Sequence, residues 1–487
     1  MDYFLSIDQG TTSTRSILFE QSGNIKSSHQ VEFKQIFPDN KSVEHDAIEI
    51  LETVKTCISN VTKDIDVKSI KSVGITNQRE TTVAWSKTTG LPLYNAIVWQ
   101  DTRTQDICDE LAADKDLSVY FDKTGLPVAT YFSLSKILWL IRNVPDIKKT
   151  LDTDVCFGTI DSWLIYNLTG NYYTDVTNAS RTLLYDLYKM EWSKDLLSKL
   201  SIPINSLPEV KPSFSNFGEL KEIIPGVPVT AVLGDQQAAL FGQNCIKKGD
   251  VKNTYGTGCF ALTNTGNNIV NSANGLLTTI AYQIEGEDAM YALEGSVPIA
   301  GAAVQWLRDN LNIIEKSEDI ESLAMMEKDN GDVYFVPAFS GLFSPHWDET
   351  ARGSLFGLTR FSNKSHMARA VLESVAFQTY ELLESMEKDL DTKFENLKVD
   401  GGMVDNNLLM QFQSDILGMS IHSQEINEIT ALGVGVASYL YAMDLPISSM
   451  SNYITSSKTW NPNMSNETRV KFLKSWNKAI EKAKNWL

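Results

Sequence analysis

A glycine followed by three hydroxyl side chains stands between two apolar runs within the first twenty residues of this chain. The apolar runs predict two strands, and Gly10 lets the chain turn tightly between them. Thr11, Thr12 and Ser13 line the turn with hydroxyls and free backbone N–H groups, which together can cradle phosphate oxygens. An ordinary polar hairpin would have the same residues, so a phosphate loop and a plain hairpin are both open at this point.

Two charged residues flank this turn. Asp8 stands at the end of the first strand, where its carboxylate can hold a hard cation, predicted to be Mg²⁺, through water. Arg15 can face the remaining phosphate charge. The chain carries a net charge of -18, so an anionic nucleotide would need such local groups to offset the overall field. The same charge argues against nucleic acid and acidic membrane surfaces as partners.

A second chemical centre is predicted at residues 229–242. A strand ends at Gly234 and a helix begins at once, which puts Asp235 at the edge where open α/β sheets bind ligands. The helix dipole favours an ionised carboxylate at that position. Asp235 is therefore our candidate for the base that accepts a hydroxyl proton during phosphoryl transfer, and a simple helix N-cap is the alternative.

Residues 253–262 repeat the opening pattern of strand, Gly/Thr turn and strand. They match the glycine spacing of dinucleotide-binding folds, but a strand follows where those folds need a helix, and the chain has no Walker A motif. We therefore expect a second phosphate loop. Two such loops, one at the start of each half, predict a duplicated architecture with the nucleotide between the halves.

A dense polar run at residues 76–82 follows a predicted buried strand. Arg79 donates and Glu80 accepts hydrogen bonds, so together they can hold adjacent hydroxyls of a polyol. Neighbours on a straight strand point to opposite faces, and both side chains reach one site only if the chain bends there. A surface ion pair is the alternative.

Other candidates follow from single segments. Trp99 can form an apolar wall for a small substrate or simply belong to the core. Tyr131 can turn its hydroxyl toward a cleft. Residues 295–307 are predicted to form a helix of small residues, with Gly301 and Gln305 one turn apart on one face.

A Gly-Gly turn at Gly401 and Gly402 is predicted between a strand and a helix. The missing side chains would let a flat adenine lie against the backbone, and Asn406 could hydrogen-bond the edge of that base.

The cysteines indicate a reducing setting. They are widely spaced and form no C-x-x-C pair, which argues against a disulfide framework or a zinc site. The N-terminus lacks a basic and apolar leader, and the most apolar helix-like stretch, residues 296–307, is far shorter than the ~20 residues of a membrane span. We expect a cytoplasmic protein that does not insert into membranes.

Taken together, the motifs resemble the FGGY family of carbohydrate kinases, and within it the members that phosphorylate glycerol, over essentially the whole chain. The resemblance is carried by residues 8–13, 77–82, 234–242, 253–260 and 400–402, with broader family patterns at 131–143 and 353–373. It implies an α/β fold of two actin-like, ribonuclease H-like domains with a nucleotide cleft between them. Residues 1–243 would form the glycerol and phosphate-loop side, and residues 244–487 the adenine side.

The resemblance also implies an activity: ATP-dependent phosphorylation of glycerol to sn-glycerol 3-phosphate in glycerol catabolism, with ATP and Mg²⁺ as cofactors and Asp235 as the general base. Asp8 would organise Mg²⁺. Glycerol would be bound by Arg79, Glu80, Tyr131, Asp235 and Gln236, with Trp99 and Phe260 as apolar walls. The nucleotide would be bound by Thr11, Thr12, Ser13, Arg15, Thr257, Gly301, Gln305, Gly402 and Asn406. A homo-oligomer, dimer or tetramer, is expected.

Two alternatives remain beside this interpretation. One is an FGGY kinase acting on a pentulose such as xylulose, against which Trp99 and Phe260 argue because they leave room for a short substrate. The other is a non-catalytic actin-like module that binds ATP, against which the two carboxylates Asp8 and Asp235 argue.

One departure from the family concerns regulation. Residues 218–228 lack the Gly-Lys-Gly-Gly-Thr-Arg loop that binds fructose 1,6-bisphosphate in bacterial members, so weak or no inhibition by that sugar is expected.

Overall fold

Two mixed β-sheets organise the computed structural model, which describes residues 1–114 and 116–487. The spatial order of the first sheet is β13 (Val229–Gly234), β5 (Ile70–Asn77), β1 (Tyr3–Gln9), β2 (Ser13–Glu20) and β3 (Ile25–Glu32). In this sheet β1 pairs antiparallel with β2, β2 pairs antiparallel with β3, and β1 and β13 both pair parallel with β5.

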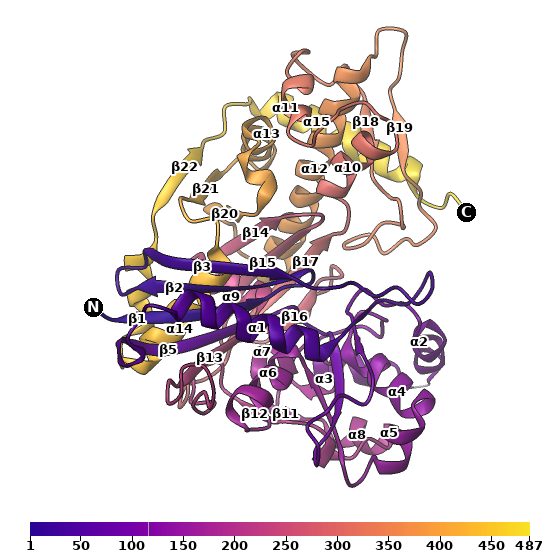
Figure 1. Cartoon of the computed structure of the whole chain (residues 1–487). Helices are drawn as coiled ribbons and strands as arrows, with labels where there is room; N and C mark the ends of the chain where they lie inside the picture. The colour runs from indigo at the N-terminus through magenta and orange to yellow at the C-terminus, as the bar shows by residue number, and fades with distance from the viewer. Residues whose placement is uncertain (115) are drawn as a thin grey trace.

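The second sheet repeats this order and these strand directions. Its full order is β16 (Leu277–Tyr282), β17 (Met290–Val297), β15 (Cys259–Gly266), β14 (Val251–Tyr255), β20 (Asn396–Asp400), β21 (Ser420–Gln424) and β22 (Ser456–Trp460). The central strand β14 pairs antiparallel with β15 and parallel with β20, β17 pairs antiparallel with β15, and β21 pairs parallel with β20. The predicted duplicated α/β architecture is confirmed, and Figure 1 shows the two sheets in two lobes.

Helix α1 (Ala47–Thr62) illustrates why the first lobe folds as it does. Asp46 caps it by accepting from two backbone N–H groups, and Ile50, Val54 and Ile58 on one face are buried. The lobe also holds α2 (Gln105–Ala112), α3 (Ser118–Thr124), α4 (Ser133–Asn143), α5 (Pro145–Thr150), α6 (Ile160–Thr169), α7 (Val176–Ala179) and α8 (Lys194–Leu200).

Smaller sheets complete this lobe. They are the four-stranded set β4 (Glu44–His45), β7 (Ala96–Ile97), β6 (Thr82–Ser86) and β8 (Val155–Thr159), and the pairs β9 (Tyr173–Asp175) with β12 (Glu209–Lys211) and β10 (Tyr185–Asp186) with β11 (Glu191–Trp192). Two 3₁₀ turns are η1 (Val67–Ser69) and η2 (Ile204–Ser206).

The second lobe is built around the long helix α12 (Lys364–Leu390), whose buried face packs on β15 and β17 and on α13 (Asn407–Leu417). Its other elements are α10 (Gly301–Asp309), α11 (Asp319–Ala324), β18 (Tyr334–Val336), β19 (Ser354–Phe356), η3 (Gly402–Asp405) and α15 (Asn466–Ala483). The 3₁₀ turn η4 (Ile447–Tyr453) packs instead on α14 (Ile429–Ala442) and on Phe4 of the first sheet. No helix in the described part of the chain is long and apolar enough to cross a membrane.

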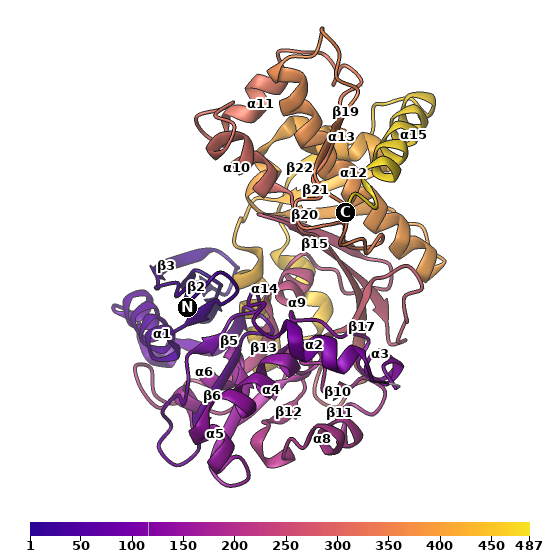
Figure 2. The ribbon, with the colours of Figure 1, turned by 90° about the vertical axis from the view of Figure 1, so that its right-hand side faces the viewer.

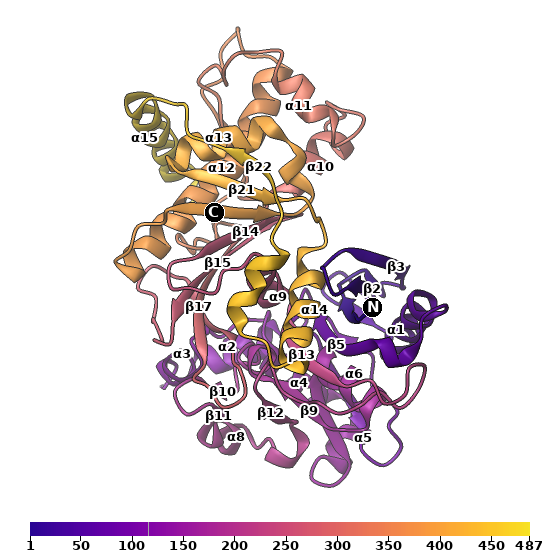
Figure 3. The same ribbon diagram turned by 90° about the vertical axis from the view of Figure 1, so that its left-hand side faces the viewer.

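The two halves of the chain meet at a pair of helices, α9 (Asp235–Gly242) and α14 (Ile429–Ala442). Helix α14 comes late in the chain yet packs on β1, β5 and β13, and it is the yellow helix beside the indigo strands in Figures 1 and 3. The approach is very close, because a Cβ on Gly433 would lie 2.0 Å from the carbonyl oxygen of Ala238. The glycine is therefore required where α14 crosses α9, and the crossing joins the two lobes, whose separation Figure 2 shows from the side.

One predicted element is wrong. Residues 295–307 were expected to form a single helix, but Met290–Val297 is strand β17 and the helix α10 begins at Gly301. Strand β17 pairs with β15 and β16 on its two sides and is mostly apolar, and a short, mostly apolar run does not distinguish strand from helix. Gly301 and Gln305 still lie on the same helix, one turn apart.

Candidate active site

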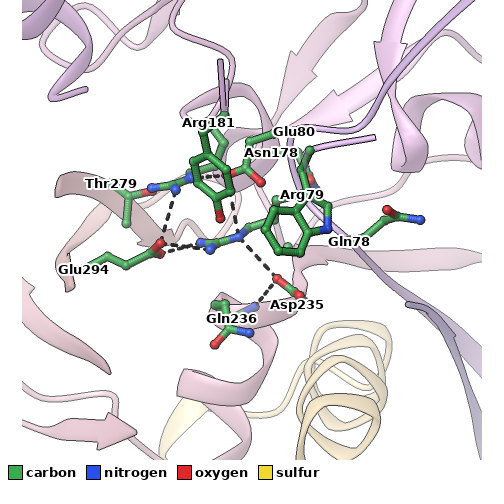
Figure 4. Close-up of polar contacts among 12 residues, drawn as sticks. Gln78, Arg79, Glu80, Asn178, Arg181, Asp235, Gln236, Thr279 and Glu294 are labelled. Atoms are coloured by element: carbon green, nitrogen blue, oxygen red, sulfur yellow. Dashed lines mark hydrogen bonds and ion pairs between the residues drawn. The ribbon is translucent and has the colours of Figure 1, made fainter. Parts of the chain in front are cut away.

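The chain bends in the polar run that follows β5, which is the condition under which Arg79 and Glu80 can reach one site. Glu80 has a φ of 60°, a left-handed conformation that is strained for a residue with a side chain. This turn brings Arg79 Nε within 3.9 Å of Glu80 Oε1, so the two neighbours point toward one place instead of opposite faces. Both side chains are almost completely buried, which rules out the alternative of a surface ion pair (Figure 4).

Asp235 is the exposed member of this group. It is the first residue of α9, with Gly234 at the N-cap position, and 35% of its side chain is exposed. Its Oδ1 accepts a hydrogen bond from Gln236 N at 2.7 Å and lies 3.2 Å from Arg79 Nε. The turn before it is anchored because Gly234 N donates to Thr177 Oγ1 at 2.9 Å. The carboxylate is thus oriented by buried neighbours while remaining accessible.

Two residues that the sequence interpretation did not include complete the cluster. Glu294, on β17 of the second sheet, accepts hydrogen bonds from Arg79 Nη1 at 2.5 Å and Nη2 at 2.9 Å. It also accepts from Arg181 Nη2 at 3.1 Å, and Arg181 Nε donates to Glu80 Oε1 at 2.7 Å. Figure 4 shows the two guanidinium groups and two carboxylates linked in this way.

Charge balance explains how the cluster stays buried. Burial raises the pKa of Glu294, but Arg181 and Arg79 outweigh it and hold that pKa at about 2. Burial raises the pKa of Glu80 despite the same two guanidinium groups. A signal for Glu294 was available in the sequence: it is the one charged residue in the mostly apolar run 290–297, and a carboxylate buried in such a run needs a partner.

Trp99, predicted as an apolar wall, lies beside Tyr131, which is predicted to bind glycerol. The rings of Trp99 and Tyr131 are 5.6 Å apart and nearly perpendicular, and both are half-buried. Trp99 Nε1 donates to Thr11 Oγ1 at 3.0 Å, so this wall touches the first Gly/Thr turn. Burial raises the pKa of the Tyr131 phenol. The buried Lys136 ammonium donates to the carbonyl oxygens of residues 130 and 131 and thereby holds the segment that carries this tyrosine.

Gln236 lies on α9 and Phe260 on β15 of the second sheet. Gln236 Oε1 accepts from Lys252 Nζ at 2.6 Å, and burial lowers the pKa of this lysine. Lys252 is a further residue that the sequence interpretation missed. Phe260 pairs with Ser296, two positions along β17 from Glu294, and so lies on the sheet face that carries that carboxylate.

The first Gly/Thr turn is closed by a hydrogen bond from Gly10 N to Ser13 O at 2.9 Å. Arg15 is already engaged: its Nε donates to Gln30 Oε1 at 3.0 Å, and Nη1 forms an ion pair with Glu428 at the start of α14. Asp8 lies beside Arg15 in the β1–β2 register.

Asp8 is the residue to test for a cation site. Burial, with the negative charges of Asp235 and Glu428, raises its pKa to about 7. Crowded carboxylates of this kind fit a cation. No group of three or more His, Cys, Asp or Glu side chains placed to hold a metal occurs in residues 1–114 and 116–487. Mg²⁺ commonly binds through one or two carboxylates together with substrate phosphates, so these residues fit that ion.

A cavity of about 460 Å³ brings together the residues predicted for the nucleotide in the second half of the chain. It is lined by Thr257, Gly301, Gln305, Gly402 and Asn406, with Val304, Ile320, Leu372 and Met403 among the apolar side chains. A Cβ on Gly402 would meet no atom within 4 Å, whereas a Cβ on Gly301 would lie 2.7 Å from Gly256 O. Asn406 Oδ1 caps α13 by accepting from Leu409 N. A larger hollow of about 680 Å³, between residues 151–155 and 190–210, contains none of the predicted site residues.

The chain is similar to known proteins over nearly all of its length. Residues 3–242 match the N-terminal domain, and residues 251–440 the C-terminal domain, of the FGGY family of carbohydrate kinases. A glycerol kinase of Brucella anthropi is 49% identical over 99% of each chain, and one of Chloroflexus aggregans is 49% identical over 100% of this chain and 99% of the relative.

Solved structures give the same picture. The structure of Plasmodium falciparum glycerol kinase with ADP superposes with a TM-score of 0.95 at 40% identity, covering 99% of this chain and 98% of the other. A xylulose kinase of Lactobacillus acidophilus has a TM-score of 0.89 at 22% identity, with 99% and 98% of the two chains covered, which is a likeness of fold.

Proposed function

Because this chain belongs to the FGGY family of carbohydrate kinases, we propose that it is a glycerol kinase, which transfers the γ-phosphoryl group of ATP to a terminal hydroxyl of glycerol and forms sn-glycerol 3-phosphate. The single observation that carries the proposal is the accessible Asp235 carboxylate, held 3.2 Å from the buried Arg79 and next to Glu80. Arg79 can donate a hydrogen bond to one hydroxyl of a small polyol and Glu80 can accept one from another, while Asp235 acts as the base for the hydroxyl that is phosphorylated.

In this proposal glycerol lies against Trp99 and Tyr131, with Phe260 as the opposite wall. Glu80 accepts from one hydroxyl, and the Nε side of Arg79 faces the acceptor, because Glu294 and Gln237 occupy its two Nη groups. Gln236 adds a polar contact. Asp235 takes the proton from the attacking hydroxyl, a modest demand on a base because the transition state of phosphoryl transfer is loose.

ATP lies across the two Gly/Thr turns. Thr11, Thr12 and Ser13 supply N–H and hydroxyl groups to the phosphates, with Arg15 beside them, and Thr257 does the same from the second turn. The adenine lies in the 460 Å³ cavity, against Gly402 and within reach of the Asn406 amide. Asp8 holds Mg²⁺, which neutralises phosphate charge when bound.

The proposal also includes the domain boundary, the location in the cell and the oligomeric state. The chain divides into domains at residues 243 and 244, between the two matched family segments. The protein resides in a reducing cytoplasm, which fits its five free and buried cysteines. It assembles as a homodimer or homotetramer, which light scattering after size-exclusion chromatography measures.

The test is formation of ADP from MgATP by the purified protein with glycerol, xylulose, gluconate or no acceptor. We expect turnover that depends on glycerol. Turnover with only a sugar acceptor would keep the family mechanism and overturn the substrate. ATP binding without any acceptor-dependent turnover would overturn the enzymatic proposal in favour of a non-catalytic ATP-binding module.

A further inference from the structure

Arg181 connects side chains that the proposed function assigns to glycerol, although its own side chain is completely buried. Its Nε donates to Glu80 Oε1 at 2.7 Å. Its guanidinium carbon lies 5.7 Å from the centre of the Tyr131 ring, within the range of a cation–π contact. Arg181 therefore contacts two of these side chains directly, from behind the site.

Glu294 contacts a third side chain that the proposed function assigns to glycerol, that of Arg79. It binds both Nη groups of Arg79 in a two-pronged ion pair, the geometry that fixes a guanidinium group most firmly. The same carboxylate accepts from Arg181 Nη2 at 3.1 Å. Because Glu294 lies on β17, this contact also ties Arg79 to the sheet of the other half of the chain.

The direction of these contacts matters for their role. Glu294 and Gln237 use the two Nη groups of Arg79, so its Nε is the group that faces Asp235 at 3.2 Å. If Glu294 were neutral, the guanidinium group would lose its strongest partner and could rotate toward Asp235 or Glu80. A free Glu80 carboxylate would likewise change its orientation without Arg181.

We propose that Arg181 and Glu294 are positioning residues, which hold Arg79, Glu80 and Tyr131 in the geometry that binds the acceptor. The inference rests on the proposed function and adds two residues that act through others. It predicts that their replacement weakens use of the acceptor and leaves use of the nucleotide unchanged, because the nucleotide cavity is lined by other residues.

The experiment compares Glu294→Gln and Arg181→Lys with the wild type. Each variant keeps the approximate size of the side chain, and Arg181→Lys keeps the charge but can no longer bond Glu80 and Glu294 as a fork. Steady-state kinetics are measured with the acceptor that the wild type phosphorylates, and thermal melting shows whether each variant is folded. We expect the acceptor KM to rise by about tenfold or more, with the ATP KM changed by less than about twofold.

Glu373→Gln is the matched control. Glu373 is also a buried glutamate paired with an arginine, since it accepts from Arg369 Nε at 2.9 Å, but it lies on α12 and its partners are Arg369 and Asn330. We expect Glu373→Gln to change the melting temperature about as much as Glu294→Gln does and to leave the acceptor KM unchanged. Combining Glu294→Gln with Arg181→Lys should raise the acceptor KM by less than the product of the single effects, because both act on one network.

Clear outcomes overturn the inference. An acceptor KM within about twofold of the wild type in folded Glu294→Gln or Arg181→Lys would do so, as would equal rises in the acceptor and ATP KM values. If one of these two variants does not fold, the acceptor KM of the other still tests the inference. Failure of the proposed function is a separate result, because it would show as a wild type without glycerol-dependent turnover.

Discussion

The acceptor cluster and the nucleotide cavity are built in opposite ways. The acceptor cluster consists of Arg79, Glu80, Arg181, Asp235 and Glu294, and all but Asp235 are almost completely buried and joined by ion pairs. The nucleotide cavity is lined by backbone at glycines, by apolar side chains, by a few amides and hydroxyls, and by the acidic side chains of Glu318, Glu321 and Asp405. One site is defined by paired, buried charges held in fixed directions, and the other largely by space that side chains leave free.

This difference indicates how each region selects its substrate. Buried charges discriminate by direction, because an ion pair or hydrogen bond that is slightly misplaced leaves a polar group unsatisfied at a high cost. A cavity lined by glycine discriminates by shape, because a group that does not fit is excluded by steric clash. Substitutions in the two regions should therefore separate the kinetics of the two substrates.

The largest effect is expected for Asp235→Asn. The amide keeps the size of the side chain but does not accept the hydroxyl proton, so kcat should fall by about 10³-fold. Because this side chain is partly exposed, the melting temperature should change by less than about 2 °C. The rate is measured by coupled detection of ADP at saturating glycerol and ATP. A kcat within about tenfold of the wild type would remove Asp235 from the role of base.

Glu80→Gln should act on the acceptor alone. The amide oxygen can still accept from Arg181, but the charged hydrogen bond to a glycerol hydroxyl is lost, which is worth about 1.5–3 kcal/mol, or about 10- to 150-fold in glycerol KM. The ATP KM should stay within about twofold. Initial rates over a matrix of both substrates give the two constants. A parallel rise of both KM values would mean that the acceptor cluster and the nucleotide cavity are not independent.

Gly402→Ala and Gly402→Val form a graded steric series in the nucleotide cavity. A Cβ at Gly402 meets no atom within 4 Å, so neither variant should lose stability, yet each places carbon atoms where the base is proposed to lie. We expect the ATP KM to rise by about threefold for Ala and about tenfold for Val, with glycerol KM unchanged. Fluorescence titration with a nucleotide analogue measures the same effect at equilibrium. An unchanged affinity in the Val variant would place the adenine elsewhere.

The smallest effect concerns a buried carboxylate outside both regions. Asp161 accepts from Thr174 Oγ1 at 2.6 Å, and burial, with the charge of Asp175, raises its pKa from 3.8 to about 7. The folded state therefore holds a proton that the unfolded state has released, and this contribution to stability falls as pH rises from about 4 to about 7 and is constant above.

Asp161→Asn removes that dependence. The difference in melting temperature, variant minus wild type, should grow by about 3 °C between pH 5 and pH 7 and then level off. Differential scanning calorimetry across this range measures it. Both KM values should be those of the wild type, which would show that a buried charge matters for binding only when it contacts the acceptor side chains.

Local sequence signals were sufficient for much of the fold and for many candidate residues. The glycine and hydroxyl turns after β1 and β14 fall between strands as expected, and Asp235 begins the helix that follows β13. Each of these features depends on a few neighbouring residues and on the geometry of a tight turn or a helix end. Such features are written into consecutive residues, so the sequence could predict them.

Other features depend on contacts between residues that are distant in the sequence, and these features follow from the three-dimensional fold. Arg181 and Glu294 are 113 positions apart and meet because β17 lies opposite the loop after α7. The strand conformation of residues 290–297 follows from pairing with β15 and β16, and the left-handed turn at Glu80 from the contacts around it. Sheet pairing and buried ion pairs gain their free energy from partners that the local chain does not contain, and for that reason the sequence alone determined the turns and the structure determined the network.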